Sequence, residues 1–133
     1  MHSATNSFSR EISQFFDAYF ESYELATSYI ELLLLLHEHE KLSQKEIAEQ
    51  MNLAPSTITR FIKKLEKKGL TSKEKDGRSA LIVLSENGKK TATEMGKAYS
   101  RAKADLEKIL GEKFVSTTEQ LLEHGAALLK ENQ

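Results

Sequence analysis

The residues best suited to bind another molecule are lysines, arginines and hydroxyl side chains gathered between Ala54 and Lys90. This segment holds ten lysine and arginine residues against four acidic ones, although the whole chain of 133 residues has a formal net charge of −1. A basic block within an acidic frame favours a local surface that binds a polyanion. Because many charged clusters are only solvated surface, the spacing of these residues has to decide between the two interpretations.

The first half of the block has the spacing of an amphipathic helix that begins at Pro55. Its expected buried face consists of Ile58, Phe61, Ile62 and Leu65. At 100° per residue, the opposite face carries Ser56, Arg60, Lys63 and Lys67, with Thr57, Thr59 and Lys64 on the flanks. Hydroxyls and arginine suit base edges and phosphates, whereas lysines suit phosphates, and the helix N-terminus adds partial positive charge. The pattern predicts a face that can bind nucleic acid.

The second half of the block, from Lys73 to Gly88, predicts a short hairpin with a basic tip. Asp76-Gly77 tolerates the positive φ angles of a tight turn, and Arg78 follows directly. The β-branched and apolar residues after the turn suit a strand. We expect strands at about residues 71–75 and 80–84.

The elements around this block predict a winged helix-turn-helix. Ser43 and Glu46 have the spacing of a capping box that starts a short helix, and three residues separate that helix from Pro55. Gly69 follows the C-cap of the second helix. Two short helices joined by a tight turn and followed by a basic hairpin are the components of this DNA-binding unit.

Helices are also predicted on both sides of this unit. Apolar residues recur at helical spacing over residues 8–23, and Thr27 is a plausible N-cap for a leucine-rich helix that ends near His37. Ser85 and Glu86 begin a long helix of about 25 residues, Gly111 breaks it, and a last helix follows. The expected fold class is mainly α with a small β-hairpin (α+β).

Targeting signals are not expected in this sequence. The longest apolar run, Leu32 to Leu36, is far shorter than the roughly 18 residues that a membrane-spanning helix needs. The N-terminus lacks the basic region and apolar segment of a signal peptide. We therefore expect a cytoplasmic protein without a membrane partner.

The runs LSQKEIAEQMNLAPSTITRFIKKLEKKGL and KDGRSALIVLSENG resemble the multiple-antibiotic-resistance regulator (MarR) family of winged helix-turn-helix transcription regulators. The specific points are Asp76-Gly77-Arg78, which matches the family's Asp-x-Arg wing motif, and the stretch from Leu84 to Gly88, which matches its Leu-Thr-x-x-Gly. The resemblance implies one MarR-type domain over residues 1–133, with a DNA-binding part at 25–90 and dimerisation helices at 8–24 and 91–131.

The same resemblance implies a homodimer that places two recognition helices in successive major grooves of a pseudo-palindromic double-stranded DNA site. Arg78 would reach into the minor groove, with Asp76 helping to hold its guanidinium. The predicted DNA-contacting residues are Ser43, Pro55, Ser56, Thr57, Thr59, Arg60, Lys63, Lys64, Asp76 and Arg78. The terminal apolar stripes independently favour a partner subunit, because a small winged domain cannot cover both.

A small aromatic effector is a further implication of the resemblance, since family members often bind small aromatic or phenolic ligands in a crevice between the dimerisation and DNA-binding parts. The candidate ligand-binding residues are Phe15, Phe16, Tyr19, Tyr23 and Tyr29. Aromatic residues at helical spacing are also typical of a core or an interface, so the sequence leaves both interpretations open.

Catalytic and metal sites are not indicated. His37 and His39 alternate with glutamates, but the chain has no cysteine and no clear third metal ligand. No nucleophile elbow, phosphate-binding loop or His-Glu-x-x-His pattern occurs. We expect a ligand-responsive transcription regulator, often a repressor in this family, that is not an enzyme and has no cofactor. The alternative is a winged-helix protein-interaction module without DNA binding, which the net charge of −1 leaves open.

Overall fold

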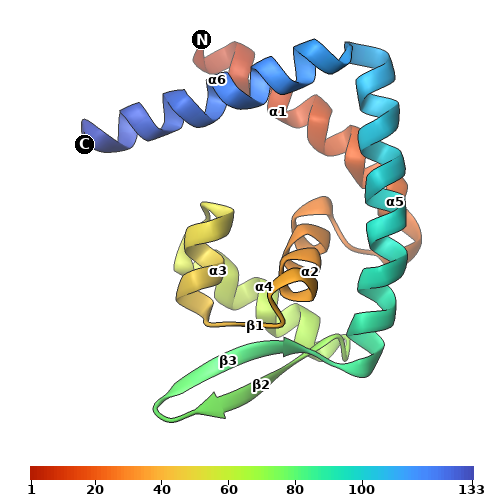
Figure 1. Ribbon diagram of the computed structural model, residues 1–133, viewed down its shortest axis with the longest axis vertical. Helices are drawn as coiled ribbons and strands as arrows, with labels where there is room; N and C mark the ends of the chain where they lie inside the picture. Colours follow the sequence, from red (N-terminus) through yellow and green to blue (C-terminus); the bar gives the residue numbers. More distant parts are fainter. The chain divides into compact units, whose positions relative to one another are not determined.

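The computed structural model describes the backbone of residues 1–133 and every side chain except that of Asp76. The elements in chain order are α1 (His2–Asp17), the 3-10 helix η1 (Ala18–Tyr23), α2 (Thr27–His39), β1 (Lys41–Leu42), α3 (Gln44–Met51), α4 (Pro55–Lys67), β2 (Thr71–Asp76), β3 (Ser79–Leu84), α5 (Glu86–Leu110) and α6 (Glu112–Glu131) (Figure 1). The predicted fold class is confirmed. The chain divides within α5 into two compact units, residues 1–99 and 100–133.

The first unit has a hydrophobic core to which η1, α2, α3, α4, β3 and α5 all contribute. Its largest fully buried side chains are Phe20, Ile30, Leu32, Leu33, Leu36, Ile47, Ile58, Ile62, Leu65, Ile82 and Met95. Full burial of one such side chain contributes roughly 1.5–3 kcal/mol. The helix-turn-helix is therefore fixed by its apolar faces, which leaves its polar faces free.

A three-stranded antiparallel sheet with the strand order β1-β3-β2 completes the first unit. β2 and β3 pair from Thr71–Leu84 at one end to Asp76–Ser79 at the other, so each strand is one residue longer than predicted. The two turn residues are Gly77 and Arg78, and Gly77 has a φ of 65° that suits glycine. In Figure 1 the hairpin extends beyond α2, α3 and α4, with the turn at its free end.

The predicted N-cap of α2 is wrong by one residue. The N-cap is Ala26, and Thr27 is the first helical residue. The backbone N–H and the hydroxyl of Thr27 both donate to Asp17 Oδ1, over 2.8 and 2.6 Å. A carboxylate from the end of α1 therefore supplies the acceptor that a local cap would otherwise provide.

The predicted helix over residues 8–24 is divided in the structure. α1 starts at His2 and ends at Asp17, and the chain continues as η1 before Glu24 adopts a left-handed conformation with φ 55°. Phe20 on η1 is fully buried. Helical spacing of the apolar residues continues across this change, so the sequence pattern did not reveal it.

Four other predicted boundaries are confirmed. Ser43 and Glu46 form a complete capping box, and Pro55 occupies the first turn of α4. Gly69, after the C-cap Lys68, has a φ of 75°. Gly111 separates α5 from α6 with a φ of 92°.

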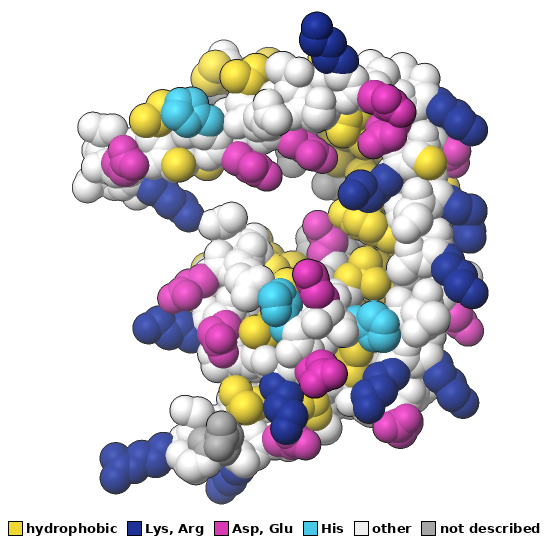
Figure 2. Space-filling model, viewed as in Figure 1, with side chains coloured by type: hydrophobic (Ala, Val, Ile, Leu, Met, Phe, Trp, Pro, Cys, Tyr) yellow, Lys and Arg dark blue, Asp and Glu magenta, His cyan; other side chains and the backbone are white. Residues whose placement is uncertain are grey.

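The second unit consists of the end of α5 and α6. α6 has no buried residue, and its large apolar side chains are at the surface. The exposed ones are Phe114, Leu121, Leu122, Leu128 and Leu129. Figure 2 shows hydrophobic side chains along the surface of this helix. Of the helices that the structure describes, none has the length and apolar character needed to cross a membrane.

Candidate nucleic-acid interface

The helix-turn-helix is held by its two buried faces and by a sharp turn. Ile47 and Ala48 bury one face of α3, and Ile58, Ile62 and Leu65 bury one face of α4. Between the helices, Asn52 adopts the left-handed conformation with φ 55°, which asparagine tolerates better than most residues. This geometry aims the opposite face of α4 outward.

The outer face of α4 is polar and basic, as predicted. The side chains of Ser56, Arg60, Lys63 and Lys64 are exposed, and Thr57 is half-buried. The only acid of α4, Glu66, is turned partly inward, and its carboxylate lies 3.9 Å from Lys73 Nζ on β2. The exposed cations of α4 therefore stand without an acid between them.

Thr59 and Pro55 are tied to the packing of the two helices. The Thr59 hydroxyl lies 3.0 Å from the Pro55 carbonyl and 3.2 Å from Gln44 Oε1 of α3. A hydroxyl has one proton and two lone pairs, so acceptor capacity remains for an outside group. Sequence reasoning missed Gln44, although its place directly after the N-cap Ser43 was a usable signal.

Ser43 is occupied by helix capping, but its hydroxyl proton is not. Its Oγ accepts from the Glu46 N–H over 3.1 Å, and its own N–H donates to Glu46 Oε1 over 3.0 Å. The backbone hydrogen bond from Ser43 lowers the pKa of Glu46, with a smaller contribution from the Ser43 side chain. The hydroxyl at this helix start can still donate a hydrogen bond.

Lys64 has an intramolecular partner that the sequence did not indicate. Its Nζ lies 4.8 Å from the centroid of the Tyr29 ring, and that ring stacks on Phe61 with a centroid distance of 4.1 Å. An ammonium over an aromatic face is attracted by about 0.5–1 kcal/mol at an exposed site. The Tyr29 ring therefore competes with a phosphate for the Lys64 ammonium.

The hairpin presents Arg78 at its free end, where the residue is exposed. Ion pairs link the body of the hairpin to neighbouring elements, since Glu74 lies 2.9 Å from Lys41 on β1 and Lys73 approaches Glu66 on α4. The Lys41–Glu74 pair is about half exposed and the 3.9 Å Lys73–Glu66 pair is long, so each contributes little to stability. The predicted role of Asp76 lies outside the described side chains.

The five candidate ligand residues fall into separate groups. Phe15 contacts Phe16 and Tyr19, with ring centroids 5.8 and 5.4 Å apart, and Phe16 stacks on Tyr99 of α5. Tyr23 instead donates to Glu94 over 3.2 Å. Tyr29 belongs to the Phe61 stack described above.

The first aromatic group also has an acidic neighbour. Burial raises the pKa of Glu31 above the usual value for glutamate, and a hydrogen bond with Tyr99 opposes this rise. Tyr99 thus connects the Phe16 stack to a carboxylate on α2. Among the described side chains, no group of three or more His, Cys, Asp or Glu residues is placed to hold a metal ion.

Comparisons with known proteins agree with this geometry. Residues 28–83 match the model of the MarR family. The staphylococcal HTH-type transcriptional regulator SarZ (Staphylococcus aureus, strain USA300) is 40% identical over 85 residues, which cover 61% of this chain and 57% of SarZ. The organic hydroperoxide resistance transcriptional regulator of Bacillus subtilis is 36% identical over 83 residues, which cover 60% of this chain and 56% of that protein. The chain thus spans little more than half the length of these curated relatives.

Solved structures share the fold over nearly the whole chain. A MarR variant from E. coli in complex with operator DNA superimposes with a TM-score of 0.81 and 16% sequence identity, covering 92% of this chain and 91% of that one. At this identity the likeness concerns the fold alone.

Proposed function

Because this chain belongs to the MarR family of winged helix-turn-helix transcription regulators, we propose that it regulates transcription in the cytoplasm by binding double-stranded DNA as a homodimer. The family is one of transcription regulators and not of enzymes. The observation that carries the proposal is the outer face of α4, where exposed hydroxyls and cations stand without an acid. A helix with such a face fits the major groove of B-DNA.

Each part of the surface has its own role in this proposal. Arg60 and the hydroxyls of Ser56 and Thr57 read base edges or nearby phosphates, and Lys63 and Lys64 bind phosphates. Arg78 enters the minor groove beside the helix, where the negative potential attracts arginine. The wing supports this role because its two-residue turn leaves Arg78 exposed at the tip.

The homodimer is supported by the apolar surface of α6. Leu121 and Leu129 are 65% and 70% exposed, which is unusual for leucines that recur at helical spacing. A second copy of the chain would cover this surface, and a two-fold axis would then make the DNA site pseudo-palindromic.

A small aromatic effector completes the proposal. The rings of Phe15 and Tyr19 are only partly buried and lie next to Phe16 and Tyr99. Partly exposed aromatic side chains can stack on an aromatic ligand. Titration of aromatic acids and phenols against a Phe15→Ala variant, with DNA release as the readout, tests this part separately.

The DNA proposal is tested by the salt dependence of binding. Arg60, Lys63 and Arg78 give three cationic contacts per subunit, and Lys64 adds a fourth if it leaves Tyr29. Counterion release of about 0.9 per contact predicts a log–log slope of about −7 for eight contacts in a dimer, or about −5 for six.

The measurement is fluorescence anisotropy with a duplex that the protein itself selects from a random pool, between roughly 50 and 200 mM salt. The Lys64→Ala variant distinguishes the two slopes, because only a lysine that reaches the DNA changes the slope when it is removed. A slope near zero, or failure to select any duplex, would favour a winged-helix module that binds proteins.

A further inference from the structure

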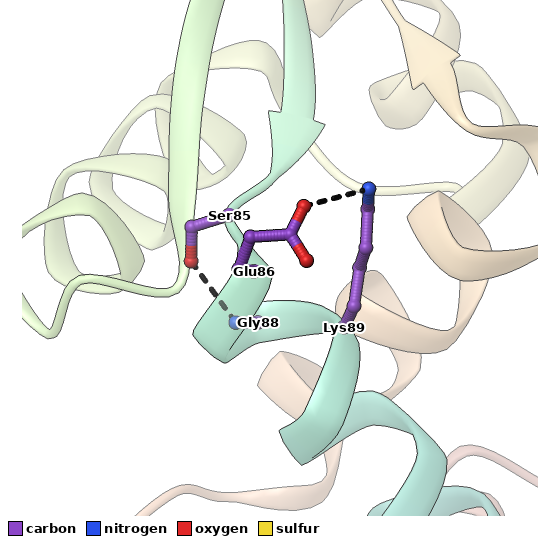
Figure 3. A network of polar contacts seen from close by, with 4 residues as sticks. All are labelled: Ser85, Glu86, Gly88 and Lys89. Atoms are coloured by element: carbon purple, nitrogen blue, oxygen red, sulfur yellow. Dashed lines mark hydrogen bonds and ion pairs between the residues drawn. The ribbon is translucent and has the colours of Figure 1, made fainter.

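A compact set of backbone contacts joins the end of the helix-turn-helix to the start of α5. We call Gly69, Leu70, Ser85 and Gly88 the Ser85 joint. The backbone N–H of Ser85 donates to the Leu70 carbonyl over 3.0 Å. The Ser85 hydroxyl donates to the Gly69 carbonyl over 2.7 Å. It also accepts from the Gly88 N–H over 2.9 Å, a contact that Figure 3 shows. One serine thus binds both the residues that follow α4 and the first turn of α5.

Gly88 makes the contact between these two segments unusually close. A Cβ atom placed on Gly88 would lie 2.0 Å from the Leu70 carbonyl oxygen and 3.0 Å from the Leu70 carbonyl carbon. Gly88 lies within α5 and is buried, so glycine is required here by space. Because the obstacle is backbone, any side chain at this position would push the start of α5 away from Leu70.

The neighbouring ion pair does not have the same importance. Lys89 and Glu86 approach to 3.3 Å beside the joint, as Figure 3 shows, but both side chains are largely exposed. Such pairs contribute little to a fixed geometry. Within this set of contacts, the hydroxyl of Ser85 bridges the two segments, and the missing Cβ of Gly88 lets the first turn of α5 approach Leu70.

We infer that Ser85 and Gly88 are positioning residues that set the direction in which α5 leaves the helix-turn-helix, and with it the spacing between the two α4 helices of a dimer. This inference rests on the proposed function. α5 contains 25 residues and is therefore about 37 Å long. A tilt of about 5° at its first turn would move its far end by about 3 Å, which is close to the 3.4 Å rise between base pairs.

The geometry is tested first without DNA. The chain has no cysteine, so Lys67→Cys on α4 and Lys97→Cys on α5 give two unique sites for spin labels, both exposed. Labelled chains are diluted with unlabelled ones, and double electron–electron resonance measures the distance within one chain. We expect a broader distribution for Ser85→Ala and a shifted one for Gly88→Ala.

Two matched variants serve as controls. Ser85→Thr keeps the hydroxyl and should restore the parent distribution. Gly96→Ala changes a glycine of the same helix where a Cβ would meet only Leu34 Cδ2 at 3.7 Å, an ordinary contact. This variant should also give the parent distribution. Parent distances in both Ser85→Ala and Gly88→Ala would overturn the inference.

The second arm measures DNA spacing. The parent protein selects a duplex from a random pool, and two further duplexes carry one base pair more or less between the half-sites. Gly88→Ala should bind the selected duplex at least tenfold more weakly and lose less on one of the altered duplexes, whereas Gly96→Ala should bind all three like the parent. An equal loss on all three would overturn the spacing role. If the parent selects no duplex, the proposed function fails, and the distances still decide whether the Ser85 joint directs α5.

Discussion

The helix-turn-helix, residues 44–67, and the last helix, α6, have similar apolar periodicity but differ in whether their apolar side chains are buried. On α4, Ile58 and Leu65 are completely buried. On α6, Leu121 and Leu129 remain mostly exposed, and no residue of the helix is buried. The chain therefore buries the apolar face of the helix-turn-helix and leaves the apolar face of α6 exposed.

The starts of the helices differ between the two regions as well. α3 begins with a complete capping box and α4 with a proline in its first turn, whereas α6 begins after Gly111 without a side-chain cap. Periodicity indicates that a face requires burial, but it does not say which chain buries it. The four predictions below run from the largest expected effect to the smallest. The first two test which chain buries each apolar face, and the last two test the DNA-binding surface and the helix cap of the helix-turn-helix region.

Replacing Leu121 and Leu122 with lysine should dissociate the proposed dimer. Four leucines would leave the interface of each dimer, and because Leu121 and Leu122 are 65% and 53% exposed in the single chain, the loss is on the order of 4–7 kcal/mol of dimerisation free energy. Sedimentation velocity at micromolar concentration measures the change in mass. A double variant that remains a dimer would show that α6 does not form the interface.

Matched leucine truncations on the two helices should behave differently. Leu65→Ala in the core should cost about 2–5 kcal/mol of unfolding free energy at every protein concentration. Leu129→Ala should act mainly through association, so its effect on urea denaturation should depend on protein concentration. If both variants lose the same unfolding free energy at every protein concentration, the apolar face of α6 is not buried by a partner chain.

Arg78→Ala at the tip of the hairpin should weaken specific DNA binding by about 1–3 kcal/mol and leave the fold unchanged. Gly77→Val should be comparable, because its φ of 65° resists a β-branched side chain and the turn would misplace Arg78. Arg60→Ala should instead relax the preference at particular base pairs.

Fluorescence anisotropy on one selected duplex measures all three variants, with circular dichroism as the folding control. If Arg78→Ala binds like the parent protein, the hairpin has only a structural role.

The smallest effect is expected at the capping box. Ser43→Ala should cost about 1 kcal/mol of stability. The lowered pKa of Glu46 means that its carboxylate contributes stability above the ordinary glutamate pKa of about 4.3, and this contribution is lost as the pH falls through the lowered value. Glu46→Gln should therefore be less stable than the parent at pH 7 and equal to it at low pH. Thermal melts at several pH values, with Glu49→Gln on the exposed side of α3 as the control, measure the difference.

Local chemistry made much of the fold predictable. Ser43, Pro55 and Gly69 mark helix ends through effects that act within a few residues, and the structure confirms all three. β1 was missed because a two-residue strand has no periodicity, and it exists only because β3 supplies its partner. The cap of α2 was misplaced because its acceptor, Asp17, comes from ten residues earlier in the chain.

In the candidate site, too, features set by neighbouring residues could be predicted from the sequence, and contacts between distant residues could not. The sequence placed Arg60 and Lys63 on the outer face of α4, because helical geometry fixes the direction of each side chain relative to the buried face. It could not show that Lys64 lies over Tyr29, or that Tyr29 is separate from the Phe15 group. These contacts join residues distant in sequence, and their partners depend on how the helices pack.

The sequence by itself determined the basic helix-turn-helix, its caps and the glycine turn of the wing, since each depends on neighbouring residues and on the period of the helix. Only the tertiary structure decided what Ser85 and Gly88 contact, because the carbonyls of Gly69 and Leu70 reach them through the folding of the hairpin. The same structure decided that the apolar stripe of α4 is covered and that of α6 is not. Burial depends on which surfaces meet in three dimensions, and periodicity along one helix does not contain that information.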